Sequence, residues 1–251
     1  MSNKKRIVII GATSAIAKHC ARLWLEDQPI ELILIGRNLN HLTQEMNDLK
    51  IRSPESYILI KEADFIEPVA IQKLVDELFA QGQRIDLVLI AHGYLPKQQD
   101  CQINLTTCYD TLIVNGLSPV IFAEAFAQHM GMLNHGTIAL ISSVAGDRGR
   151  KSNYTYGAAK GLVTRYAQGL QHRFANTNVK VILIKPGPTD TPMTQNQVNS
   201  KLKLAPVEQV AKEIVSGINK EKKVIYTPKK WQIVMMIIRH LPFFLFKKMD
   251  I

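Results

Sequence analysis

The 251-residue sequence predicts an α/β fold in which a parallel β-sheet carries helices on both faces. Two observations support this prediction. Short β-branched apolar segments alternate with amphipathic segments along most of the chain, and segment 86–91 is almost continuously apolar, as in a strand buried on both faces. No internal repeat or low-complexity linker interrupts the alternation. We therefore expect one domain at 1–227, followed by a tail at 228–251.

Each expected strand is short and apolar, and most are followed by a segment with apolar residues at helical spacing. Strands are expected at 6–10, 31–35, 57–60, 86–91, 137–141, 179–184 and 224–226. Helices are expected at 14–26, 39–49, 68–79, about 105–130, 154–175 and 206–218. The last of these starts with a proline, which suits the first turn of a helix. This order of elements predicts a doubly wound sheet.

The composition is that of a folded protein, with 46% hydrophobic and 21% charged residues. Cys20, Cys101 and Cys108 have neither metal-ligand spacing nor the even number of a disulfide framework. We expect buried or half-buried thiols in a reducing, cytoplasmic compartment, and no metal site. Residues 1–6 lead directly into a strand, so no secretory signal is expected.

The net charge of +10 is concentrated near the end of the chain. Residues 201–251 contain eleven Lys and Arg against four Asp and Glu. No nucleic-acid recognition motif accompanies these charges, so a nucleic-acid partner is not expected. The surplus belongs to the tail.

The first expected strand ends in Gly11-Ala12-Thr13-Ser14-Ala15-Ile16-Ala17. A glycine here lets the chain turn tightly, and the following helix directs its positive amino end at a pyrophosphate. Ala15 and Ala17 stand where glycine is commoner, so the fingerprint is partial. We expect the loop to bind a dinucleotide through Gly11, Thr13, Ser14, Ala15 and Ile16.

The second expected strand ends in Ile35-Gly36-Arg37-Asn38. An acidic residue at this place hydrogen-bonds the ribose 2′-hydroxyl of NAD, whereas an arginine accommodates a 2′-phosphate. The planar guanidinium suits a phosphate, and no carboxylate competes for it in this stretch. We expect Arg37 and Asn38 to select NADP (NADPH). The alternative is a solvated arginine after a strand.

Tyr156 and Lys160 are four residues apart in an expected helix, which places both side chains on one face. An ammonium beside a phenol lowers the pKa of the phenol, so Tyr156 is a candidate for proton transfer. Ser143 ends the fifth expected strand, thirteen residues before the tyrosine. Ser142 is its rival for the serine role. A tyrosine and a lysine at this spacing are common in helices, so the pair alone would be read as structural.

Together these motifs resemble the short-chain dehydrogenase/reductase family in its single-domain form. The resemblance covers the chain up to about Tyr226 and includes Asn115, the Ala91-His92-Gly93 step and Pro186-Gly187-Pro188-Thr189-Asp190-Thr191. It implies a Rossmann-type sheet with strand order 3-2-1-4-5-6-7, hydride transfer from a nicotinamide, and a homodimer or homotetramer. The chain departs from the family's usual Asn-Asn-Ala-Gly at residues 90–93.

The resemblance also implies a role for each matching residue. Tyr156 would be the general acid, Lys160 would hold the nicotinamide ribose, Ser143 would hydrogen-bond the substrate oxygen, and Asn115 would anchor a water relay to the lysine. The further residues that would contact the cofactor are Asp64, Ala91, His92, Gly93, Pro186, Gly187, Thr189 and Thr191. Of these, His92 is expected to be a loop side chain and no catalyst.

Within the family, residues 143–150, 153–154 and 156–158 are similar to the branch of decaprenylphosphoryl-2-keto-erythro-pentose reductases. This similarity implies a ketone on a lipid-linked sugar as substrate, with Arg148 and Arg150 near its phosphate or simply solvated. Two alternatives stay open: reduction of another apolar or acyl carbonyl, and a non-catalytic NADP-binding sensor. Retention of the whole tetrad favours an enzyme over a sensor.

The segment 231–246 is strongly apolar and has two lysines on each side. It is shorter than a bilayer span and is interrupted by Arg239, His240 and Pro242. We expect an apolar helix whose residues 229–248 lie on a membrane surface, with Trp231 at headgroup depth, at the inner face of the cytoplasmic membrane. The alternative is a helix packed on its own domain or on a sister subunit.

Overall fold

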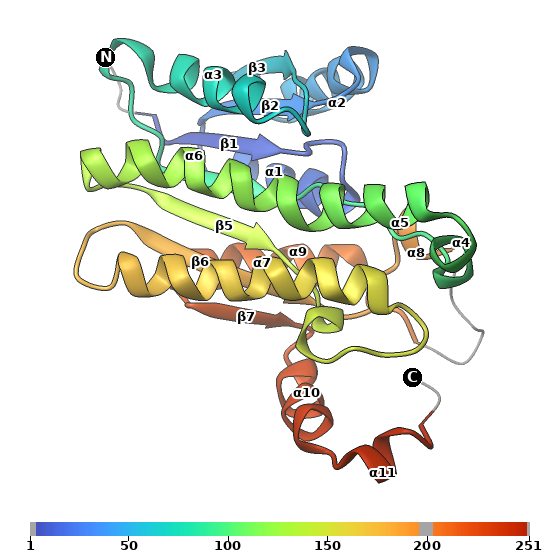
Figure 1. Ribbon diagram of the computed structural model, residues 1–251. Helices are drawn as coiled ribbons and strands as arrows, with labels where there is room; N and C mark the ends of the chain where they lie inside the picture. The colour runs from blue at the N-terminus through green and yellow to red at the C-terminus, as the bar shows by residue number, and fades with distance from the viewer. Residues whose placement is uncertain (1–3, 196–202, 250–251) are drawn as a thin grey trace.

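The computed structural model describes residues 4–195 and 203–249. Seven parallel strands form one sheet in the order β3-β2-β1-β4-β5-β6-β7, as expected (Figure 1). The strands are β1 (Arg6–Ile10), β2 (Glu31–Gly36), β3 (Tyr57–Glu62), β4 (Leu87–Ile90), β5 (Thr137–Ile141), β6 (Lys180–Pro186) and β7 (Val224–Thr227). Strands β1, β2, β4 and β6 are apolar and almost wholly buried, because helices cover both sheet faces.

Two layers of helices enclose the sheet (Figure 1). The helices on one face are α3 (Pro68–Phe79), α6 (Ser118–Leu133) and α7 (Tyr154–Arg173), and those on the other are α1 (Ala15–Asp27), α2 (Leu39–Arg52) and α9 (Val207–Asn219). Each layer forms its own apolar core with alternate residues of the strands. The predicted helix over residues 68–79 matches α3.

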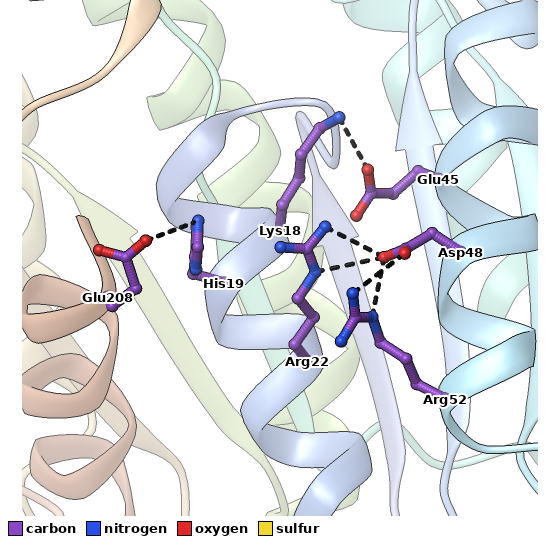
Figure 2. Close-up of polar contacts among 7 residues, drawn as sticks. All are labelled: Lys18, His19, Arg22, Glu45, Asp48, Arg52 and Glu208. Atoms are coloured by element: carbon purple, nitrogen blue, oxygen red, sulfur yellow. Dashed lines mark hydrogen bonds and ion pairs between the residues drawn. The ribbon is translucent and has the colours of Figure 1, made fainter.

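Charged and polar side chains connect helix α1 to its neighbours on both sides (Figure 2). Lys18 pairs with the buried Glu45 of α2 at 2.7 Å, and Arg22 pairs with Asp48 of the same helix at 3.0 Å. On its other side, His19 faces a carboxylate of α9 at 3.8 Å. These contacts link α1 to the helices on either side of it.

The long helix expected at about 105–130 is divided in the structure. It consists of α5 (Leu105–Leu112), a π-helical turn η2 (Ile113–Leu117) and α6. As one continuous stretch, Leu105–Leu133 is long and apolar enough to cross a membrane, but it packs in the core and 61% of its apolar window is buried. The sequence analysis missed α4 (Gln98–Ile103), α8 (Pro192–Gln195) and the short 3-10 turns η1 (Ala80–Gly82) and η3 (Val144–Asp147).

The tail forms two helices, α10 (Lys230–His240) and α11 (Phe243–Phe246), which project beyond β7 (Figure 1). Met235 and Ile238 of α10 bury themselves against Val144 in a small apolar cluster separate from the two sheet cores. The tail is therefore attached to the domain at the turn that follows β5.

Candidate active site

The predicted tetrad is brought together at the carboxyl ends of β4 and β5. Tyr156 and Lys160 lie on α7, Ser143 follows β5, and Asn115 lies in the π-turn η2. A π-helical turn inside a longer helix often marks a functional position, because it moves one side chain out of the regular register. We call these four residues the reaction side.

Asn115 is fully buried and held at both ends of its amide. Its Nδ2 donates to the carbonyl oxygen of Thr111 at 3.0 Å, and its Oδ1 accepts from the backbone N–H of Tyr94 at 2.9 Å. A Cβ at Gly93 would lie 2.7 Å from Asn115 Oδ1 and 3.5 Å from Lys160 Nζ. The side chains of Asn115 and Lys160 therefore both lie against Gly93, where a larger residue would collide with the asparagine.

The structure separates the two candidate serines. Ser142 Oγ is buried, donates to the Lys160 carbonyl oxygen at 2.8 Å and lies 2.9 Å from Thr164 Oγ1, so it is a structural residue under α7. Ser143 Oγ accepts from the backbone N–H of Ala145 at 3.1 Å, which leaves its own proton available. Ser143 is the residue that interacts with the Tyr156 phenol.

The turn η3 reaches α7 only because residue 146 is a glycine. A Cβ there would lie 2.6 Å from the Lys160 carbonyl carbon, a distance that real Cβ atoms do not adopt. This close backbone contact sets the position of Ser143 relative to the tyrosine. Gly146 is a site-forming residue that the sequence analysis did not single out.

The pKa of Tyr156 departs from our expectation. Burial raises it from 10.0 to about 12, against the lowering effects of a hydrogen bond with Ser143 and the charge of Arg150. The expectation that Lys160 makes the phenol more acidic is therefore wrong for this structure. Lys160 Nζ lies 5.8 Å from the tyrosine ring centroid and donates to the Ile141 carbonyl oxygen at 3.1 Å.

Lys160 itself is only 3% exposed. Burial lowers its pKa from 10.5 to about 8, since the ammonium has lost its water without gaining a carboxylate partner among the described residues. A lysine with a pKa near 8 exchanges protons close to neutral pH. Tyr156 is the protonated group of the pair and Lys160 the readily titrated one.

The loops after β1, β2 and β3 form what we call the nucleotide side. Gly11 has a φ of +83°, and a Cβ there would lie 2.7 Å from the backbone nitrogen of His92. Both its conformation and this close approach require glycine. Ser14, the N-cap of α1, makes no side-chain cap hydrogen bond, and the first turn of the helix has no acidic residue. The amino end of α1 therefore keeps N–H groups available for an anion.

The neighbouring residues of this loop differ in exposure. Thr13 is exposed, Ser14, Ala15 and Ile16 are half-buried, and Ala17 is buried in the core under α1. The methyl group of Ala17 thus packs against the sheet and does not obstruct the loop.

His92 lies in the loop after β4, as expected, and its side chain is buried. Its Nε2 lies 2.8 Å from Ser118 Oγ, and its ring packs edge-on against Phe65 at 4.8 Å between centroids. Burial, followed by the positive charges of Lys160 and Arg37, lowers its pKa to about 3, so the ring is neutral at physiological pH. It ties the loop after β4 to α6. Neighbouring Ala91 is buried.

Arg37, Asn38 and Asp64 follow β2 and β3 as predicted, and all three are exposed. Asn38 Oδ1 accepts from the His41 N–H at 3.0 Å, so its side chain caps α2. One oxygen of Asp64 accepts backbone N–H groups of the turn before α3, which lowers the pKa of the carboxyl. Arg37 has no such structural role in the described part of the chain, so it is the free cation at the end of β2.

The predicted loop after β6 lies beside the tail. The indole of Trp231 packs directly on Gly187, which follows the buried Pro186. Thr189 is buried and its Oγ1 donates to the Gly187 carbonyl oxygen at 2.9 Å, while Thr191 is half-buried and lies 3.2 Å from Thr194 Oγ1. Trp231 therefore packs on the domain, and the expectation that it faces a membrane is wrong.

The two arginines after Ser143 have different environments. Arg148 donates to the carbonyl oxygens of Ile238 and Leu241, and its guanidinium lies 3.8 Å above the Phe246 ring. It thus binds the tail, which corrects the expectation of a phosphate or solvent contact. Arg150 is half-buried, and its positive charge acts to lower the pKa of Tyr156. Its Nε is buried without a hydrogen-bond partner among the described residues.

A buried ion pair behind the same turn was missed. Lys185 of β6 pairs with Asp147, which also accepts from Tyr226 Oη at 2.8 Å. The only sequence signal was a lysine inside an apolar strand.

All three cysteines are free, and within 4–195 and 203–249 no group of three or more His, Cys, Asp or Glu could hold a metal ion.

A doubly wound sheet with an open helix amino end after β1 and a Tyr–Lys–Ser–Asn group after β4 and β5 defines a class of nucleotide-dependent oxidoreductases. The model of the short chain dehydrogenase family matches residues 5–202, so the chain belongs to that family.

Its relatives agree with this assignment. An uncharacterized oxidoreductase of Streptomyces coelicolor is 28% identical over 254 residues, covering 98% of this chain and 96% of the relative. A short-chain dehydrogenase from Sphingobium yanoikuyae, solved in complex with NADPH, has a TM-score of 0.81 at 20% identity and covers 98% of this chain and 96% of its own. The bulky-bulky ketone specific alcohol dehydrogenase from Comamonas testosteroni has a TM-score of 0.78 at 18% identity, covering 98% and 95%. At these identities the two structures establish the fold.

Proposed function

We propose that the protein is an NADPH-dependent reductase that converts a ketone to a secondary alcohol. The observation that carries the proposal is the meeting of Ser143, a protonated Tyr156 and the buried pair Asn115 and Lys160 at one sheet edge. A dinucleotide fits the chain's own residues, since the α1 amino end has no side-chain cap hydrogen bond and no acidic residue, while Gly11 allows the tight turn that leads into this helix. Arg37 would hold the 2′-phosphate. Binding of NADPH or NADP in two structural neighbours supports this choice.

NADPH held at this site would supply the hydride, with its two electrons, that reduces the carbonyl carbon. Tyr156 Oη gives its proton to the carbonyl oxygen, and Ser143 Oγ donates a hydrogen bond to the same oxygen as negative charge develops there. A pKa of about 12 keeps Tyr156 protonated, the form that reduction requires. Lys160, with a pKa of about 8, then returns a proton towards the phenolate, with Asn115 anchoring the water relay.

For the substrate we propose an apolar ketone, with a lipid-linked keto-sugar as the specific candidate. This choice is supported by the loop similarity at 143–158 and by Arg150, a half-buried cation whose charge acts on Tyr156 and which suits an anionic substrate group. We propose that the enzyme works at the inner face of the cytoplasmic membrane as a homodimer or homotetramer, with 1–227 as the reductase domain and 228–251 as an anchor.

The test is NADPH oxidation with a panel of ketones, comparing the wild type with Tyr156→Phe. Loss of the phenolic proton should lower kcat by about 10²- to 10⁴-fold, the usual contribution of a general acid. Tyr154→Phe is the matched control, since that hydroxyl lies at the surface and accepts a hydrogen bond from Gln102 at 3.3 Å. Equal activity of Tyr156→Phe and wild type would reject the mechanism. Tight NADPH binding without turnover on any carbonyl would favour a sensor.

A further inference from the structure

Helix α10 has two different faces. Its inner face carries Met235, which is fully buried, and Ile238, both packed on Val144 next to Ser143. At its start, Trp231 packs on Gly187, and at its end two carbonyls accept hydrogen bonds from Arg148. The helix is therefore held against the loops that follow β5 and β6.

The outer face is apolar and exposed. Ile233, Met236 and Ile237 recur at helical spacing on one side of α10, and Ile237 is 56% exposed. In the next helix Phe243 is 73% exposed, and its neighbours Phe244 and Leu245 are also exposed. We call these six residues the tail face. Six large apolar side chains in thirteen residues form a patch that usually has an occupant.

The charges around the tail face identify that occupant. Residues 222–249 contain seven Lys and Arg and no Asp or Glu. The cations that flank the tail face are exposed, and they are Lys229, Lys230, Arg239, Lys247 and Lys248. A second copy of the chain seated here would bring cations against cations. An anionic bilayer instead offers acyl chains to the apolar residues and phosphates to the cations.

A lysine-lined cavity adjoins the tail face. It has a volume of about 240 Å³ between α9, β7 and α10, and Lys212, Lys220, Lys222 and Lys229 line it with a single carboxylate, Glu213. Gln232 of α10 lines the same cavity, one residue before the tail face begins. The cavity is therefore placed to receive a lipid phosphate when the apolar residues enter the bilayer.

We propose that α10 and α11 dock the enzyme on an anionic lipid bilayer, with the tail face among the acyl chains and the flanking lysines at the phosphates. Because the inner face of the same helix contacts the loops of Ser143 and Gly187, docking brings the reaction side close to the bilayer surface. The substrate that follows, resting on the function proposed above, is an apolar or lipid-linked ketone taken from the membrane.

The test is cosedimentation of the full-length protein with vesicles of phosphatidylcholine alone and of equal parts phosphatidylcholine and phosphatidylglycerol. Binding should need phosphatidylglycerol and should weaken as salt is raised, because screening acts on the lysine contacts. The double variant Phe243→Glu/Phe244→Glu should bind at least tenfold more weakly, since two phenyl groups no longer enter the acyl chains and two carboxylates face anionic phosphates. The control is Val69→Glu on α3, where the native residue is 75% exposed.

Thermal unfolding of each variant checks that it folds, and Lys247→Gln/Lys248→Gln offers a second, milder change that should reduce binding at low salt only. Absence of vesicle binding at low salt, or equal binding by the double phenylalanine variant, overturns the proposal. If the wild type and Val69→Glu are oligomers and the double phenylalanine variant is a monomer, the tail face is instead the contact with a second copy of the chain. None of these measurements uses NADPH or a carbonyl, so docking and catalysis can fail separately.

Discussion

The nucleotide side and the reaction side of the sheet edge are built from different materials. On the nucleotide side the features are backbone ones: a glycine with positive φ and the open amino end of α1, with Arg37 as an exposed cation. On the reaction side, Asn115 and Lys160 are buried side chains whose positions are fixed by neighbouring backbone. In the function that we propose, the first region would hold the cofactor and the second would carry out the proton transfer.

The difference predicts how each side responds to mutation. A backbone site tolerates side-chain changes, since its N–H groups stay in place, and only its exposed cation should alter affinity. A buried titratable site is expensive to maintain, because each charge there has lost its water. Removing the buried charge of Lys160 on the reaction side should therefore raise stability while it lowers activity.

Lys160→Met is expected to have the largest effect. We predict a loss of kcat of about 10²- to 10⁴-fold, because the proton relay loses its titrating group. At neutral pH the variant should nevertheless unfold about 2 kcal/mol less readily. A pKa lowered from 10.5 to about 8 corresponds to about 3 kcal/mol of strain in the folded state, and loss of the hydrogen bond to Ile141 offsets about 1 kcal/mol.

The stability of the wild type should depend on pH through the protonation of Lys160. Between pH 8 and 10.5 the unfolded chain binds more protons at Lys160 than the folded one, so wild-type stability should rise with pH there, and the variant should lack that rise. Lys185→Met is the matched comparison, since Lys185 is also 3% exposed but is paired with Asp147. That change leaves a buried carboxylate unpaired and should destabilise by about 3–5 kcal/mol. If urea titrations show that both variants are destabilised, the expected stabilisation by Lys160→Met is wrong.

The fold was predictable because its signals are local. Each buried strand shows as an apolar run, and the glycine at 11 and the spacing of Ser143, Tyr156 and Lys160 are readable in order along the chain. The long helix was predicted without its π-turn, since the extra residue that displaces Asn115 leaves the apolar pattern almost intact.

What the sequence could not provide is the environment of each titratable group. The direction of the Tyr156 pKa depends on burial and on where Lys160 Nζ points, and both are properties of packing. The same holds for Arg148, whose partners lie about ninety residues further along in the tail. Trp231 looked like a membrane residue by composition, but its contact with Gly187 arises only from the fold.

Arg37→Gln tests the nucleotide side. The KM for NADPH should rise about 10- to 100-fold, the loss expected for charge-assisted hydrogen bonds to a phosphate, while the KM for NADH should change little. Neither kcat should fall, since Arg37 is placed on the nucleotide side. Arg84→Gln, an exposed arginine in the loop before β4, is the control. Equal rises for both cofactors would show that Arg37 supports the loop and does not select the 2′-phosphate.

His92 lies between the two sides, against Gly11 on one and near the charge of Lys160 on the other, and it gives the smallest effect. The pKa of His92 in the folded protein is about 3, below the ordinary 6.5. Between these two pH values the unfolded chain binds more protons at His92 than the folded one, so stability falls as the pH falls. From pH 7 to pH 5 the loss should be about 2 kcal/mol. His92→Gln, which cannot be protonated, should remove that part of the acid sensitivity, whereas His41→Gln at an exposed position of α2 should not. Urea midpoints at pH 5 and pH 7 measure the difference. An unchanged pH dependence in His92→Gln would mean that other groups cause the acid sensitivity. It would also mean that water reaches the His92 ring more easily than its packing indicates.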